Sequence, residues 1–118
     1  MNIEKLSNVL RKSWSKETHH PNFRKEWSTQ NPSIGQCAVT AFVVQDYFGG
    51  KLAYNRKHFH VWNILPDGEV VDLTREQFPQ DADIEQEGIT TREEIKEIDP
   101  TVMNRYKILK SKVLIISG

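Results

Sequence analysis

The chain has 118 residues, of which 37% are hydrophobic, 27% charged and 9% aromatic. This composition is typical of one globular domain and excludes the disordered, collagen-like and disulfide-scaffold classes. A chain of this length buries roughly two-thirds of its unfolded surface, enough for a core and a shielded cleft. The 16 basic and 16 acidic residues cancel, so the basic excess of a nucleic-acid binder is missing. We expect a single domain over residues 1–118 and no nucleic-acid partner.

Cys37 is the one cysteine of the chain, which excludes an intrachain disulfide and a cysteine-rich zinc knuckle. The first residues lack the charged-then-apolar layout of a signal peptide. The apolar runs are far shorter than the ~18 residues that a membrane-spanning helix needs. We therefore expect a cytoplasmic protein with a reduced thiol and no membrane association.

The start of the chain has the pattern of an amphipathic helix capped by Asn2. Its apolar residues recur at helical spacing, at Ile3, Leu6, Val9, Leu10 and Trp14. Residues 15–33 are polar and contain Pro21 and Pro32, which predicts a long loop or short helical turns. Loops of this kind often line functional sites.

Residues 37–48 are apolar almost all round and are followed by Gly49 and Gly50, which predicts a buried helix with a glycine cap. Residues 58–65 and 69–74 read as two strands of a hairpin around Pro66, Asp67 and Gly68. A three-residue turn pairs residue 65 with 69, 62 with 72 and 60 with 74.

The C-terminal third contains two helix signals. Thr90 or Thr91, followed three residues later by Glu93 or Glu94, resembles a capping box. A further helix is predicted to start at residues 99–100 and to run toward Lys110, and residues 113–116 are a short strand candidate. The predicted fold is α+β, with the N-terminal and central helices packed on a small antiparallel sheet.

Three residues of the chain, Cys37, His60 and Asp72, have the types and predicted positions of a catalytic group. Cys37 lies in the first turn of the buried helix, where the backbone dipoles favour a thiolate. In the predicted register His60 and Asp72 are diagonal neighbours on one face of the hairpin, roughly 7 Å apart at the backbone. A slip of one residue would move Asp72 to the opposite face, so the hypothesis depends on register.

These residue types predict acyl transfer. Cys37 would attack a carbonyl carbon, His60 would exchange protons with the thiol and the leaving group, and Asp72 would orient the imidazole. The backbone N–H of Cys37 would meet the developing oxyanion. The candidate side chains to assist it, among which the sequence does not choose, are Gln36, Gln30, Trp14 and Trp27. Trp62, on the face of His60, is a core residue or a wall of the cleft.

At these residues the sequence resembles transglutaminases. Residues 35–41 (Gly-Gln-Cys-Ala-Val-Thr-Ala) are similar to their nucleophile motif Gly-Gln-Cys-Trp-Val-Phe-Ala, residues 59–62 (Phe-His-Val-Trp) to their Phe-His-x-Trp strand, and residues 72–74 (Asp-Leu-Thr) to their Asp-Pro-Thr. The resemblance covers about residues 33–75. It implies a papain-like fold, with Cys37 as nucleophile, His60 as base and Asp72 as orienting acid.

The chain departs from that pattern in ways that leave substrate and acceptor open. Ala38 stands where transglutaminases have tryptophan, Leu73 replaces a proline, and only 23 residues separate Cys37 from His60. The chain as a whole also resembles the small bacterial YunG-like proteins. That resemblance rests on residues 13–15 (Ser-Trp-Ser), 45–50 (Gln-Asp-Tyr-Phe-Gly-Gly) and 73–78 (Leu-Thr-Arg-Glu-Gln-Phe).

Our leading hypothesis is a cysteine enzyme that hydrolyses, deamidates or transamidates a peptide or small amide through a thioester, without cofactor or metal. One alternative is a binding or structural domain with an inert core cysteine. A second is a metal site formed by Cys37, His58 and His60. The sequence leaves the oligomeric state open.

Overall fold

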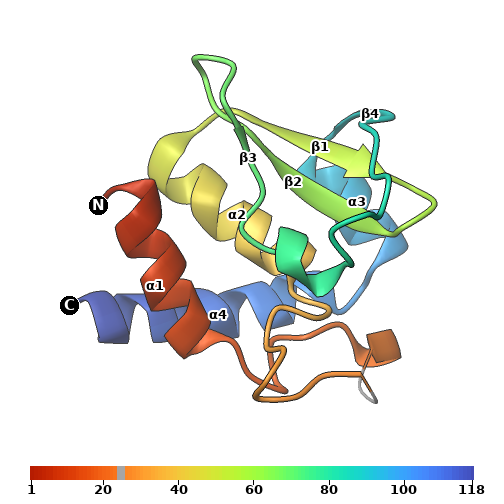
Figure 1. Ribbon diagram of the computed structural model, residues 1–118. Coiled ribbons are helices and arrows are strands. Elements are labelled where there is room, and N and C mark those ends of the chain that lie inside the picture. Colours follow the sequence, from red (N-terminus) through yellow and green to blue (C-terminus); the bar gives the residue numbers. More distant parts are fainter. Residues whose placement is uncertain (24–25) are drawn as a thin grey trace.

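The computed structural model describes residues 1–23 and 26–118, and within these ranges it combines helices with one antiparallel sheet (Figure 1). The helices are α1 (Ile3–Ser13), η1 (Pro21–Phe23), α2 (Cys37–Phe48), η2 (Arg75–Gln77), α3 (Arg92–Ile98) and α4 (Val102–Ser117). The strands are β1 (Lys51–Asn55), β2 (His60–Ile64), β3 (Val70–Val71) and β4 (Gly88–Thr90). The α+β expectation is confirmed.

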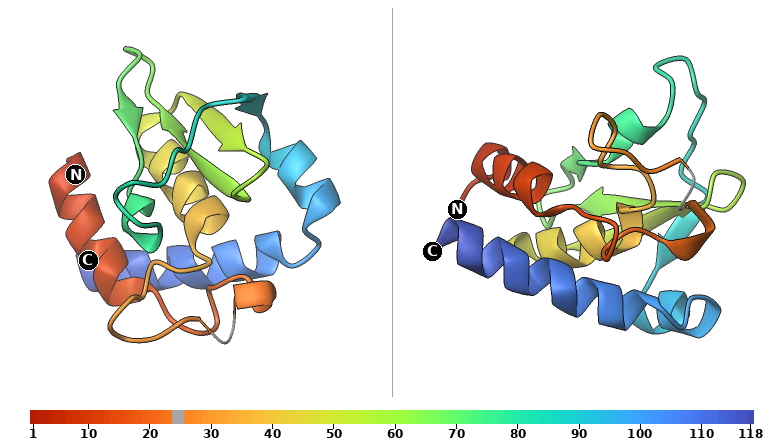
Figure 2. Two further views of the ribbon diagram at one scale, coloured as in Figure 1. Left: turned by 45° about the vertical axis from the view of Figure 1, so that its right-hand side comes forward. Right: turned by 90° about the horizontal axis from the view of Figure 1, so that it is seen from below.

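The elements form layers around the central helix. The sheet has the order β3-β2-β1-β4, with antiparallel neighbours throughout. Helix α2 packs against β1 and β2 on one side and against α4 on the other, while α1 also packs against α4 (Figure 2). In the part of the chain that the structure describes, no helix is long and apolar enough to cross a membrane.

Helix α2 is apolar on all sides because it is covered on both sides. Val39, Phe42 and Val44 are fully buried. The helix begins at Cys37 and ends at Phe48, as the sequence predicts. At Gly50, with φ 88°, an added Cβ would lie 2.2 Å from the carbonyl oxygen of Ile64, so only glycine lets β1 start this close to β2.

Helix α1 is confirmed together with its cap. The side chain of Asn2 accepts a hydrogen bond of 2.8 Å from the N–H of Lys5. Leu6 and Leu10 are fully buried in the core. The predicted loop over residues 15–33 contains the short helix η1, and residues 24–25 of that loop lie outside the described residues.

The hairpin forms in the predicted register. The N–H of Leu65 donates to the carbonyl of Glu69, and the N–H of Gly68 donates to the carbonyl of Leu65, both at 2.8 Å. Asn63 pairs with Val71, which is the pairing that the predicted turn implies. Both strands are shorter than predicted. Asp72, which follows β3, still lies on the same face of the hairpin as His60, as predicted.

The predicted strand over residues 113–116 is wrong, because α4 continues through it. Val113 extends the buried stripe of α4 at helical spacing, after Val102, Tyr106 and Leu109. The next apolar residues, Leu114 and Ile115, are exposed. The strand was predicted from the apolar character of these residues alone, and that character does not distinguish a strand from the end of a helix.

Strands β1 and β4 have no counterpart in the prediction. β1 lies between two neighbours, and its consecutive residues Leu52 and Ala53 are both buried. A strand buried in this way lacks the polar–apolar alternation by which an exposed strand is recognised. The predicted helix start is confirmed with Thr91 as its N-cap, whose hydroxyl oxygen accepts from the N–H of Glu94 at 3.2 Å.

A buried arginine ties α4 to the loop that follows α1. Arg105 is only 6% exposed, and its guanidinium pairs with Asp99 at 2.6 Å. It also donates to the carbonyl of Thr18 at 3.0 Å and to the hydroxyl of Thr101 at 3.1 Å. A charge so deeply buried is stable only with such partners.

Replacing this arginine should destabilise the fold strongly. In Arg105→Met the carboxylate of Asp99 and the carbonyl of Thr18 lose their buried partner, so we expect a loss on the order of 3–5 kcal/mol in the free energy of unfolding. Urea unfolding at pH 7 measures it. The control is Arg11→Met, which removes an exposed ion pair with Glu76 and should cost about 1 kcal/mol or less. Equal losses in the two variants would contradict the assigned role of Arg105.

Candidate active site

The thiol lies at the start of the central helix. Cys37 is the first residue of α2 and is half-buried. The first helical hydrogen bond runs from the N–H of Thr40 to the carbonyl of Gln36, so the N–H of Cys37 precedes the hydrogen-bonded part of the helix. A sulfur at this point feels the positive end of the helix dipole.

The hairpin brings His60 and Asp72 together. His60 opens β2, and Asp72 directly follows β3. The Nε2 atom of His60 lies 2.6 Å from Oδ2 of Asp72. The other carboxylate oxygen accepts from the N–H of Thr74 at 3.2 Å and from its hydroxyl at 3.4 Å. Both oxygens of Asp72 are therefore oriented, and the diagonal contact expected from the register is present.

Two aromatic rings enclose the imidazole. The ring of Trp62 stacks on His60 with 5.3 Å between centroids, and that of Phe78 meets it edge-on at 4.8 Å. His60 is only 1% exposed as a result. Trp62, expected on this face, thus serves as packing for the imidazole.

The surroundings of His60 favour its charged form. Burial by itself lowers the pKa of His60, but hydrogen bonds with Asp72 and Cys37 and the charges of these groups raise the pKa to about 9. Asp72 occupies Nε2, which leaves Nδ1 as the ring nitrogen available to Cys37. The imidazole can thus hold a proton between a carboxylate and a sulfur at neutral pH.

The residue before His60 has an unusual backbone. Phe59 adopts a left-handed conformation with φ 52°, which costs a residue other than glycine about 1–2 kcal/mol. Its carbonyl accepts a hydrogen bond from the Sγ of Cys37 at 3.5 Å. Its side chain is 76% exposed. The strained turn therefore directs a main-chain oxygen at the thiol and an aromatic ring into solvent.

The two indole groups considered as oxyanion helpers have other partners. The indole N–H of Trp14 donates to the hydroxyl of Thr40 at 2.9 Å. That of Trp27 donates to the carbonyl of Pro32 at 3.1 Å. An indole has only one N–H, so neither group can meet an oxyanion in this conformation.

The two side-chain amides considered as oxyanion helpers also have other hydrogen-bond partners. Gln36 is fully buried and donates through Nε2 to the carbonyl of Ser15 at 3.1 Å. It holds the loop before α2 against the end of α1. Gln30 is exposed, and its Oε1 accepts from the hydroxyl of Thr29 at 3.4 Å. Neither contact links these amides to the sulfur.

Gln77 is a site residue that the sequence reasoning missed. Its Oε1 accepts from the N–H of Gly35 at 3.2 Å, and its Nε2 lies 3.5 Å from Nδ1 of His60. It is the last residue of η2, a one-turn helix without a periodic pattern. The available signal was its place five residues after Asp72, within the segment that resembles YunG-like proteins.

The geometry does not support the metal alternative. In residues 1–23 and 26–118, no three His, Cys, Asp or Glu side chains are grouped so that they could hold a metal ion. His58 contacts the carbonyl of Asp83 through Nε2 at 3.2 Å and packs edge-on against Phe78. It is therefore oriented by partners other than Cys37 and His60.

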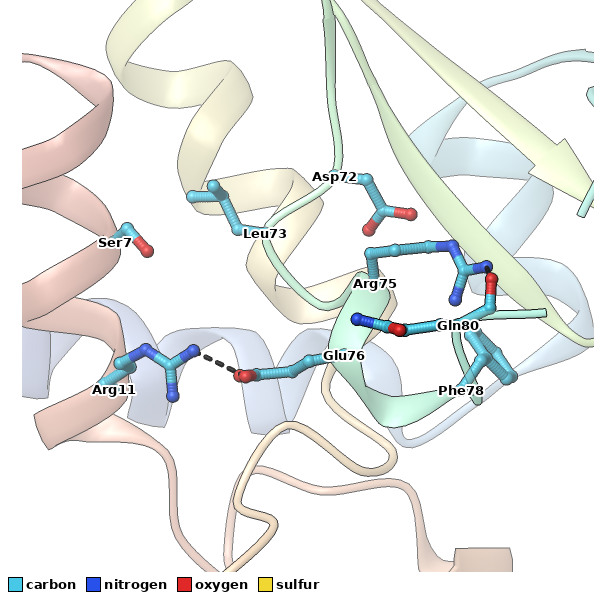
Figure 3. A pocket seen from close by; sticks show the side chains of 8 residues that line it. All are labelled: Ser7, Arg11, Asp72, Leu73, Arg75, Glu76, Phe78 and Gln80. Atoms are coloured by element: carbon cyan, nitrogen blue, oxygen red, sulfur yellow. Dashed lines mark hydrogen bonds and ion pairs between the residues drawn. The ribbon is translucent and has the colours of Figure 1, made fainter. Parts of the chain in front are cut away.

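A cavity of about 520 Å³ lies between α1 and the segment that contains Asp72 (Figure 3). Its lining residues come from α1 and from the segment after β3, and they are Ser7, Arg11, Asp72, Leu73, Arg75, Glu76, Phe78 and Gln80. The ion pair between Arg11 and Glu76, with 2.5 Å between charged atoms, crosses it. Cys37 is not among the lining residues, so the cavity gives solvent access to the carboxylate rather than to the sulfur.

The proton on His60 should make stability depend on pH. An unfolded histidine loses its proton near pH 6.5, whereas folded His60 keeps it up to about pH 9. Its stabilisation is complete below pH 6.5 and is lost as the pH rises through this window. The free energy of unfolding should therefore fall by up to about 3 kcal/mol between pH 6.5 and 9.

Urea unfolding across this pH range measures the effect. His60→Gln has no titrating ring and should remove most of the fall, whereas the control His58→Gln should keep it. A wild-type protein with the same pH dependence as His60→Gln would contradict the assignment of the proton to His60.

The comparisons with known proteins agree with the whole-chain resemblance. The family model described as YunG protein matches residues 2–116. Uncharacterized protein YunG of Bacillus subtilis (strain 168) is 39% identical over 95 residues, which cover 78% of this chain and 76% of that protein. No solved structure matches the chain. The chain belongs to the YunG family.

Proposed function

We propose that the chain is a cysteine-dependent enzyme that transfers an acyl group from an amide through a thioester intermediate. Cys37 is the nucleophile, His60 the proton carrier and Asp72 the residue that orients and charges the imidazole. The substrate is an amide of a peptide or small molecule. The reaction needs no cofactor.

In the first half of the reaction the sulfur of Cys37 attacks the carbonyl carbon, and the carbonyl oxygen takes the displaced electron pair. When that oxyanion collapses, the C–N bond breaks, and the leaving nitrogen takes the proton from Nδ1 of His60. In the second half, water or an amine attacks the thioester carbon and gives its proton to His60. The C–S bond then breaks, and the thiolate returns beside the imidazolium.

The observation that carries the proposal is the contact between the buried His60 ring and the carboxylate of Asp72. Nε2 of this buried ring lies 2.6 Å from a carboxylate oxygen of Asp72, and Cys37 acts with Asp72 to raise the pKa of the ring. The order Cys, His, Asp along the chain and their elements also agree with the transglutaminase resemblance. A papain-like assignment of the fold is part of this proposal.

One contact favours the alternative of an inert cysteine. The Sγ of Cys37 lies 3.5 Å from the carbonyl of Phe59, where a neutral thiol can donate. In that alternative, the three side chains hold α2 against the hairpin. The two functions differ in the ionisation of the sulfur, which alkylation reports directly.

Alkylation by iodoacetamide between pH 5.5 and 9 tests the proposal. An ordinary thiol is only about 1% ionised at pH 6.5, so a thiol paired with His60 should react roughly 10- to 100-fold faster there. His60→Ala should lose this advantage, and Asp72→Asn should lose part of it. The rate of modification of Cys37 is followed by mass spectrometry of the intact protein.

His58→Ala is the matched control, because His58 is a neighbouring histidine with a carbonyl partner of its own. It should react like the wild type. Circular dichroism verifies that each variant is folded. A folded wild type that reacts at the same rate as folded His60→Ala at every pH would establish the inert cysteine instead.

A further inference from the structure

We infer that Gln77 is the side-chain donor that stabilises the oxyanion formed when Cys37 attacks its substrate. This inference rests on the proposed function and adds a catalytic residue to it. The amide of Gln77 acts together with the backbone N–H of Cys37. The negative oxygen thus accepts one hydrogen bond from a residue of η2 and one from the first residue of α2.

The first argument is the fixed orientation of the Gln77 amide. The N–H of Gly35 donates to Oε1 at 3.2 Å. A backbone N–H can only donate, so the oxygen of the amide must face Gly35 and the nitrogen must face the other way. Gly35 is two residues before Cys37, which couples the donor to the segment that carries the nucleophile.

The second argument is the side of the imidazole on which the donor lies. Nε2 of Gln77 is 3.5 Å from Nδ1 of His60. The opposite ring nitrogen is hydrogen-bonded to Asp72, which leaves Nδ1 as the ring nitrogen available to Cys37. The amide nitrogen therefore lies beside the ring atom through which the proposed proton transfer runs, and a carbonyl attacked by the sulfur would bring its oxygen toward this edge of the ring.

The third argument is that the imidazole of His60 does not accept a hydrogen bond from the amide nitrogen of Gln77. The pKa of His60 is raised to about 9, so Nδ1 carries a proton at neutral pH. Two donors then face each other at a distance beyond that of an ordinary hydrogen bond. An oxygen that gains negative charge between them accepts from either group, and such an interaction is stronger in the transition state than before it.

The backbone provides the second donor. The N–H of Cys37 precedes the first hydrogen bond of α2, and the side chain of Gln36 makes no cap. One main-chain and one side-chain donor form a common type of oxyanion hole. The indoles and amides expected from the sequence are engaged elsewhere, as described above.

Two reactions of Cys37 separate this role from a structural one. Acetylation by p-nitrophenyl acetate forms an S–C bond, passes through an oxyanion and releases p-nitrophenolate. Alkylation by iodoacetamide forms an S–C bond and releases iodide without any oxyanion. We expect Gln77→Ala to slow acetylation by roughly 10²–10³-fold and to leave alkylation unchanged.

Gln77→Glu is the sharper variant. It keeps an oxygen for the N–H of Gly35 but has no N–H to offer the oxyanion, so it should lose acetylation to a similar degree. The control is Gln80→Ala, because Gln80 is an exposed glutamine three residues away. It should keep both rates.

The outcomes separate the two levels of the proposal. A wild-type protein that is not acetylated at Cys37 overturns the proposed function and this inference with it. Acetylation of the wild type with equal rates in Gln77→Ala or Gln77→Glu overturns the inference alone. Equal slowing of acetylation and alkylation also overturns it, because Gln77 would then act only by positioning His60 or the thiol.

Discussion

The candidate site depends on a proton held by a ring that water does not reach. His60 is 1% exposed, and burial alone would drive the proton off. Asp72, which is hydrogen-bonded to one ring nitrogen, and Cys37 reverse that preference. The remaining elements serve this contact: α2 carries the sulfur, the hairpin carries ring and carboxylate, and Trp62 and Phe78 close the pocket around the imidazole.

Local signals were sufficient to predict the parts of the chain that carry this contact. Gly49 and Gly50 end a helix whatever surrounds it, because they adopt positive φ without strain. The turn at residues 66–68 sets the pairing of the strands beside it, and hence the face on which Asp72 lies. Helix end and turn type are encoded within a few residues, so the start of the helix at Cys37 and the pairing of His60 with Asp72 were readable from the sequence.

The parts that the sequence did not reveal depend on distant neighbours. β1 is a strand because β2 and β4 flank it, and α4 extends to Ser117 because Val113 finds a place in the core. Gln77 is held at the site by a hydrogen bond that its side-chain oxygen accepts from the N–H of Gly35, which is 42 residues away. No periodicity in a short segment encodes such a contact.

The candidate triad occupies a short stretch of chain, with 23 residues from Cys37 to His60 and 12 from His60 to Asp72. The entropy lost on closing a loop grows only with the logarithm of its length, and these loops are short. Assembling the three groups therefore restricts the chain little. α1 and α4 contribute no residue to the candidate triad, so sequence change on their solvent faces can adapt the molecule to new surroundings while the candidate site keeps its shape.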